Sequence, residues 1–323
     1  MPRRAWLAAA LALLMALLAG CAVQTETLRR APPSGLAPRV ELAATPFFPQ
    51  TEYHCGPAAL ATVLAGWPDI GREATPQRLG DEVFLPARTG TLQIEMIAGA
   101  RRHGAVATKL PGTLEALLRE LQAGHPVVVL QNLGLSWYPA WHYAVLVGYD
   151  LEAGDVILRS GTTERQVLPM RTFEHTWVRA GSWAFVALPP GQWPATAEEA
   201  AVVEAAVGFE RAAAPAQAVR AYRSALQRFG GSLSLQMGLG NSLHASGDRA
   251  AAAQAFEDAT RLHPGSAPAW INLASTRADL GQREAALAAA RQGVAVADAT
   301  WSDRARALLA SLQAQAKDSP SPR

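Results

Sequence analysis

A period of 34 residues runs through the last third of the chain and restricts it to stacked helical hairpins. Copies aligned from Glu199, Leu233 and Ala267 bring small residues and turn glycines into register at Ala218, Ala252, Ala286, Gly247 and Gly281. A helix–turn–helix unit of this length cannot bury its apolar face alone, so neighbouring units must stack. The pattern predicts an all-α region with copies over 199–232, 233–266 and 267–300, and with a cap helix that extends the region to residue 317.

These copies resemble the tetratricopeptide repeat in their period and in the placement of aromatic residues at Tyr222 and Phe256 and of Pro264 at the end of the second copy. The first copy departs from the pattern, because Pro215 lies near its turn and Gly230 replaces the closing proline. A generic alanine-rich helical bundle is the alternative. The resemblance implies a groove for a peptide or partner protein, and a purely structural buttress is the second interpretation.

The first 20 residues have the layout of a bacterial export signal. Arg3 and Arg4 precede an apolar run over 5–20, which is shorter than the roughly 20 residues of a bilayer span. The ending over 18–21 resembles the lipobox, which implies cleavage before Cys21, acylation of that cysteine (palmitate included) and anchoring in a membrane. Ala22 favours the outer membrane of a Gram-negative cell, facing the periplasm. A plain signal peptide or an uncleaved anchor is the alternative.

Charge and cysteine content exclude several classes of function. Without residues 1–20 the 29 basic residues fall by two arginines to 27, which balance the 27 acidic residues, so nucleic acid is not an expected partner. The chain has two cysteines, and acylation of Cys21 leaves Cys55 as a lone thiol. We therefore expect no intramolecular disulfide, and we predict no metal and no cofactor. An unpaired thiol in an oxidising compartment is either buried or used.

Composition divides the chain further. Residues 21–45 are polar and proline-rich and predict a flexible lipidated tether; 46–190 carry most aromatic and β-branched residues; 191–198 form a linker and 318–323 a disordered tail. Within 46–190 the periodicities predict helices over 56–64, 91–103 and 113–123, then strands over 126–131, 142–149, 155–159 and 181–188. Helices followed by an antiparallel sheet indicate an α+β domain.

Cys55 lies where an extended segment turns into an apolar helix, and this position suits a nucleophile. The free amides and positive end of a helix dipole favour a thiolate there. The Cys55 backbone N–H and the Gln50 carboxamide are candidate oxyanion donors. His142, at the head of an apolar strand, is the candidate base; His54 is a minor alternative, because sequence neighbours at such a turn point apart. A buried structural cysteine is the competing interpretation.

The segments Gln50, Cys55–Ala58 and His142–Asp150 resemble the C-thirty-nine-like peptidases, papain-like cysteine peptidases related to those that remove double-glycine leaders from bacteriocins. The resemblance covers about residues 46–190. It implies a papain-like fold, a nucleophilic Cys55, a base and acid in His142, and an oxyanion role for Gln50. The chain contains no exporter membrane domain and no ATP-binding loop, so it is not a bacteriocin transporter.

One position departs from that family. The strand after the histidine strand normally ends in an aspartate that orients the imidazole, and here Ser160 stands in its place. A hydroxyl stabilises an imidazolium far less than a carboxylate does. Asp150, Asp155 and Asn132 are alternative partners. The chain works as a Cys–His dyad with a weak orienting residue, or its activity is low or lost.

Three functional hypotheses follow. The first is a membrane-anchored cysteine peptidase whose repeats recruit a partner or a peptide or protein substrate. The second is a non-catalytic scaffold lipoprotein that binds a partner. The third is an amidase or acyl transferase acting on cell-wall peptides. The loop over 132–141 carries Trp137, Tyr138 and Trp141, which either line a substrate groove or cover the edge of the sheet.

Overall fold

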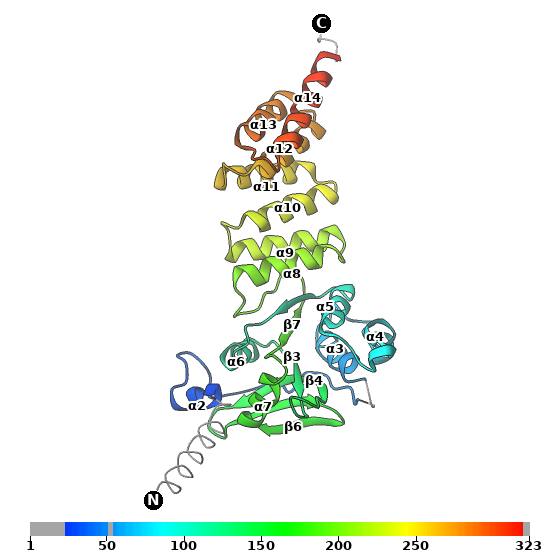
Figure 1. The fold of residues 1–323 in the computed structure, drawn as a ribbon, viewed down its shortest axis with the longest axis vertical. Helices are drawn as coiled ribbons and strands as arrows, with labels where there is room; N and C mark the ends of the chain where they lie inside the picture. Colours follow the sequence, from blue (N-terminus) through cyan, green and yellow to red (C-terminus); the bar gives the residue numbers. More distant parts are fainter. Residues whose placement is uncertain (1–22, 51–53, 319–323) are drawn as a thin grey trace, which may run out of the picture. The chain divides into compact units, whose positions relative to one another are not determined.

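The computed structural model describes residues 23–50 and 54–318, and these divide into two compact units (Figure 1). The first unit holds the described residues up to Pro189 together with Trp193–Ala201, and the second holds Pro190–Gln192 and the chain from Val202 onward. The predicted signal segment and Cys21 lie outside the described residues.

The first unit is an α+β domain built on one antiparallel sheet. Its helices are α2 (Val23–Arg30), α3 (Cys55–Ala65), α4 (Pro76–Val83), the 3-10 turn η1 (Pro86–Arg88), α5 (Gln93–Arg102), α6 (Leu114–Gln122) and α7 (Met170–Val178). Its strands are β1 (Arg39–Glu41), β2 (Val106–Lys109), β3 (Val127–Asn132), β4 (Trp141–Asp150), β5 (Asp155–Ser160), β6 (Thr163–Pro169) and β7 (Ala184–Leu188). The α+β class predicted from the sequence is confirmed, although α7 interrupts the strands and β1 and β2 precede most of them.

The sheet has the order β2-β7-β3-β4-β5-β6, and β1 adds to β4. The long strand β4 is central: its first half pairs with β3, with His142 opposite Gln131, and its second half pairs with β5. Gly148 lets β1 approach, because a Cβ at this residue would lie 2.7 Å from the carbonyl oxygen of Val40. Burial on both faces explains the near-continuous apolar run of β4.

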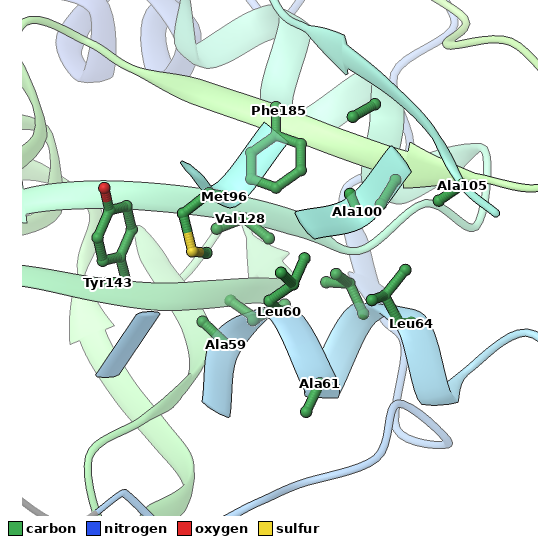
Figure 2. Close-up of a cluster of buried hydrophobic side chains, with 14 of the residues drawn as sticks. Ala59, Leu60, Ala61, Leu64, Met96, Ala100, Ala105, Val128, Tyr143 and Phe185 are labelled. Carbon is green, nitrogen blue, oxygen red and sulfur yellow. The ribbon is translucent and has the colours of Figure 1, made fainter. Parts of the chain in front are cut away.

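Alternating residues of the strands belong to two hydrophobic cores, one on each face of the sheet. On one face α3, α4 and α5 pack against Tyr143, Val128 and Phe185; Figure 2 shows Leu60 of α3 and Met96 of α5 meeting these strand residues. On the other face α2, α6 and α7 pack against the strand residues of opposite parity, such as Ala144. The sheet is therefore the middle of three layers, and α3 is fixed along its length by buried alanine, leucine and valine side chains.

The predicted flexible tether over 21–45 is wrong for its described part, which is folded onto the first unit. The buried Glu174 carboxylate of α7 accepts hydrogen bonds from the amides of Gln24 and Thr25 and from Thr25 Oγ1, at 3.0, 2.8 and 2.6 Å. The buried guanidinium of Arg159 donates to the carbonyl of Ala43 at 2.9 Å. Polar composition suggested a tether, but these polar groups satisfy buried partners.

The predicted linker over 191–198 also differs from the structure, because Trp193–Ala201 belong to the first unit. Glu120 of α6 is fully buried and accepts hydrogen bonds from the amides of Ala195 and Thr196, at 3.2 and 2.8 Å, and from Thr196 Oγ1 at 2.6 Å. His125 Nδ1 lies 2.7 Å from the same carboxylate. These hydrogen bonds lower the pKa of Glu120 against the desolvation that raises it, so the carboxylate stays charged and holds the segment.

The second unit is all-α, as the repeat predicted. The helix α8 (Glu199–Glu210) begins in the first unit and continues into the second, whose other helices are α9 (Pro215–Arg228), α10 (Leu233–Ala245), α11 (Arg249–Leu262), α12 (Ala267–Asp279), α13 (Arg283–Val296) and α14 (Ser302–Asp318). Ser232, Asp248 and Ser266 cap α10, α11 and α12 through their side chains. Close packing depends on small residues: a Cβ at Gly238 would lie 2.2 Å from Tyr222 Cζ, and one at Gly240 would lie 2.4 Å from Phe256 Cε1.

Replacement of Glu174 by alanine tests the docking of α2. It leaves three donors without their buried acceptor, and we expect the free energy of unfolding in urea to fall by about 2–3 kcal/mol. Trypsin should then cleave after Arg29 or Arg30 faster than in the parent. The control is Glu115→Ala, which removes a half-exposed pair with Arg119 and should change stability by less than about 0.5 kcal/mol. Equal trypsin cleavage in both variants would contradict the docked helix.

Gly238→Ala tests the packing of the repeats. In an exposed helix this change gains about 1 kcal/mol, but here the new Cβ overlaps the buried Tyr222 ring and should cost about 1–3 kcal/mol instead. Gly265→Ala is the matched control, since its Cβ would meet nothing within 4 Å. Thermal unfolding monitored by circular dichroism gives both values, and a stabilised Gly238→Ala variant would exclude this packing.

Candidate active site

Cys55 is the first residue of α3, and the residues around it leave its sulfur at the wall of a cavity. Pro57 occupies the first turn, where its missing N–H breaks no hydrogen bond. Gly56 packs directly against Thr91, because a Cβ at Gly56 would lie 2.7 Å from Thr91 Cβ. The glycine therefore allows the segment that precedes α5 to lie against the start of α3, next to the thiol.

The surroundings of Cys55 favour the neutral thiol over the thiolate. Burial raises the pKa of Cys55, and the backbone amides of Tyr143, Gly56 and Cys55 itself oppose this rise only partly. The sequence led us to expect a thiolate favoured by the helix N-terminus. The shift of the Cys55 pKa is in the opposite direction, because desolvation of the buried thiol outweighs the backbone hydrogen bonds at the start of α3.

His142 is the second residue of β4 and its ring is held by Ser160. The distance from His142 Nε2 to Ser160 Oγ is 2.9 Å. Burial lowers the pKa of the imidazole below its usual value near 6.5. The imidazole is therefore neutral at neutral pH, and with Nε2 engaged by Ser160 its Nδ1 is the nitrogen left to accept a proton. The structure records no hydrogen bond between His142 and Cys55, both of which it describes.

Ser160 is the only one of the predicted orienting candidates with a recorded contact to the imidazole among the described residues. Asn132 Oδ1 accepts hydrogen bonds from the amides of Gly134 and Ala140, at 3.0 Å each. Asp150 Oδ1 accepts a hydrogen bond from the amide of Ala153 at 2.9 Å. Asp150 and its strand partner Asp155 lie at the far end of β4 from His142. A hydroxyl both donates and accepts, so Ser160 does not fix the imidazole tautomer as a carboxylate would.

Gln50 lines the same cavity and is held by the turn that follows Ser160. Its backbone N–H donates to the carbonyl of Gly161 at 3.0 Å, directly after Ser160. Its side chain lines the cavity with Cys55, and its Oε1 is buried without a hydrogen-bond partner among the described residues. Residues 51–53, which connect it to His54, lie outside the described residues.

The cavity encloses about 950 Å³ and is lined by residues from several separate segments of the first unit. The lining residues are Gln50, Cys55, residues 88–94, Leu130, Trp141–Tyr143, Gly161 and Ala180. The residues over 88–94 were not among the site residues predicted from the sequence. The one signal in the sequence was the pair of apolar residues Leu92 and Ile94 at the start of the helix predicted over 91–103; both are exposed and line the cavity.

The remaining candidates lie elsewhere. His54, the alternative base, stacks on Phe84 with ring centroids 5.2 Å apart and does not line the cavity. Within the described part of the chain, no three side chains of the metal-binding types come together. The described helices include none with the length and apolar character needed to cross a bilayer.

The geometry permits thiol chemistry. A neutral thiol at a helix start, a neutral imidazole with one free nitrogen, and a carboxamide face one cavity. The Tyr143 amide lies against the sulfur and links it to the strand that carries His142. A tetrahedral intermediate, formed when the sulfur bonds to a substrate carbonyl carbon, would lie in the cavity that Cys55 and Gln50 both line.

Comparison with known proteins follows the division of the chain. Residues 42–185 match the model of the Peptidase C39-like family, and residues 233–276 match a tetratricopeptide repeat. A C39-like peptidase from Bacillus anthracis is 20% identical with a TM-score of 0.39, covering 47% of this chain and 98% of its own.

Solved tetratricopeptide structures also align. The type III secretion chaperone SycD of Yersinia enterocolitica is 12% identical with a TM-score of 0.34, over 36% of this chain and 83% of its own. The Sgt2 domain of Aspergillus fumigatus is 20% identical with a TM-score of 0.36, over 40% and 89%. No curated protein matches the chain. The matched models therefore show similarity to the C39-like peptidases in the first unit and to the tetratricopeptide repeat in the second.

Proposed function

We propose that this chain is a cysteine peptidase, anchored through acylated Cys21 at the outer membrane and facing the periplasm, that hydrolyses peptide bonds at Cys55. The observation that carries the proposal is the convergence of Cys55, Gln50 and His142 on one cavity, with the imidazole held by Ser160 at 2.9 Å. The match of residues 42–185 to a peptidase family supports the reaction class. The repeats recruit a protein partner or substrate, a role that tetratricopeptide repeats commonly have.

The proposed reaction starts from two neutral groups. Nδ1 of His142 takes the thiol proton as the sulfur of Cys55 bonds to the scissile carbonyl carbon. The Cys55 N–H and the Gln50 carboxamide N–H stabilise the oxyanion, and the imidazolium is held at Nε2 by Ser160. The imidazolium then protonates the leaving amine, the C–N bond breaks, and a thioester remains. Water attacks this thioester with His142 again as base, which releases the acid and restores the thiol.

The alternative functions remain open to the same tests. A non-catalytic scaffold is favoured by two specific observations: the thiol pKa is raised, and Ser160 replaces the carboxylate that would stabilise an imidazolium. An amidase or acyl transferase would use the same residues on cell-wall peptides. Assay of murein fragments beside protein substrates separates the peptidase from this third function.

The rate at which iodoacetamide alkylates Cys55 tests the proton transfer, using the chain without residues 1–21. The reactive thiolate forms by proton transfer to neutral His142, so we expect the rate to fall on the acid side as the imidazole becomes protonated. Because burial lowers the pKa of His142, this acid limb should lie below pH 6.5, the ordinary value for histidine. His142→Ala should slow alkylation at pH 7 by roughly 100-fold, in the range for loss of a general base.

The control is His54→Ala, which removes an imidazole outside the cavity and should leave the profile unchanged. An identical profile in the parent and in His142→Ala would refute the activated pair and support the scaffold.

Ser160→Asp tests how the imidazole is oriented. A carboxylate at this position accepts the Nε2 proton, fixes the tautomer and stabilises the imidazolium, so the pKa of His142 should rise. The acid limb should then move to higher pH, while kcat/KM for peptide hydrolysis at pH 7.5 increases. Ser160→Ala should lower kcat/KM roughly tenfold, since the imidazole loses its one recorded partner.

Thr163→Asp is the matched control, because it places a carboxylate opposite Ser160 in the hairpin but on an exposed residue. An acid limb that stays in place in Ser160→Asp would show that Ser160 does not govern the imidazole.

A further inference from the structure

Arg88 is a cation at the wall of the Cys55 cavity. It is exposed, lines the cavity and makes no ion pair with any described residue. Among the described residues that line the cavity, Arg88 is the only one with a permanent charge, and none is a carboxylate. The described residues of the lining therefore favour an anionic group over a cationic one.

The backbone around Arg88 is fixed by its own hydrogen bonds. The amide of Leu85 donates to the carbonyl of Gly90 at 2.8 Å, and the amide of Arg88 donates to the carbonyl of Leu85 at 2.9 Å. Thr89 has a φ of 46°, a left-handed conformation that is unfavourable for a β-branched residue. Such conformations persist where the surrounding structure imposes them, often beside a bound ligand. Arg88 is thus presented from a closed turn.

Apolar side chains line the cavity beside this charge. Leu92, Ile94 and Trp141 line it while remaining 44%, 70% and 57% exposed. Trp141 follows a loop braced by Asn132, which accepts the amides of Gly134 and Ala140. Large apolar side chains held open to solvent on ordered elements indicate a binding surface.

We infer that the Cys55 cavity selects peptides that place a carboxylate on Arg88 and bulky apolar side chains against Leu92, Ile94 and Trp141. This inference rests on the proposed function, whose substrate class it specifies. The carboxylate comes from an acidic side chain or from the end of the peptide chain. Peptides that carry lysine or arginine at that place are disfavoured, because no carboxylate among the described lining residues would receive them.

Binding to the full-length chain carrying Cys55→Ala tests the inference without requiring catalysis. Fluorescence anisotropy measures Kd for four labelled peptides with the same apolar residues. Two carry a carboxylate: one has a glutamate and an amidated C-terminus, and one has uncharged side chains and a free C-terminal carboxylate. The other two are amidated at the C-terminus: one has uncharged side chains and one has a lysine. We expect at least one carboxylate peptide to bind about two- to fivefold tighter than the neutral amide, the effect of one accessible ion pair. Whichever carboxylate peptide gains identifies the source.

Arg88→Gln should remove this preference, whereas Arg72→Gln, an exposed arginine away from the cavity, should retain it. Ile94→Gln should raise the Kd of all four peptides by roughly three- to tenfold, since burial of apolar surface is lost. Leu262→Gln, an exposed leucine in the second unit, should weaken none. Both substitutions in each pair are at exposed residues, so the variants should fold.

Equal affinity for all four peptides, a preference for lysine, or binding to none of them would overturn the inference. Binding of the protein to phosphatidylcholine vesicles in place of peptides would also overturn the inference. Such binding through the apolar residues would give a blue shift of tryptophan fluorescence that Ile94→Gln abolishes. Selective binding together with an inert thiol in the alkylation test would retain the recognition site and refute the peptidase.

Discussion

The last residues of β5 and the turn after it hold the separate parts of the candidate site together. The Arg159 guanidinium donates to the carbonyls of Ala43 and Thr45, so the segment leading to Gln50 lies over the sheet. Ser160 contacts His142, and the Gly161 carbonyl accepts the Gln50 amide. Three consecutive residues thus fix the approach of Gln50 and the ring of His142. Displacement of this one strand end would separate groups that come from distant parts of the chain.

The sequence predicted the elements that depend on local pattern. The 34-residue period predicted the second unit, because each copy repeats the same apolar and small positions. The start of α3 and the strand headed by His142 followed from an apolar run and its boundary. Cys55, Gln50 and His142 line one cavity in the structure, as their predicted roles require, and those roles stay predictions.

What the sequence could not predict depends on partners distant in the chain. Residues 23–45 are polar and suggested a tether, but Glu174 and Arg159, far along the chain, supply buried partners for their backbone. The thiol pKa was misjudged for the same reason, since helix position is local and burial is not. The residues over 88–94 have no periodic pattern, so their place on the cavity wall followed only from the fold. The one local signal for Arg159 was a charged residue within an apolar strand.

If the thiol and the imidazole are both neutral at rest, the rate of the proposed reaction depends mainly on how well the site stabilises the oxyanion. A preformed thiolate would enter the reaction already charged, whereas here charge separates as the sulfur attacks. Stabilisation must then come from groups that meet the developing charge, namely the Cys55 amide and the Gln50 carboxamide. Gln50 is placed by Gly161 and, through the segment before it, by Arg159. The end of β5 therefore positions a residue on which the proposed reaction at Cys55 depends. Because Ser160 stabilises the imidazolium less than a carboxylate would, the proposed reaction depends more on an accurately placed Gln50.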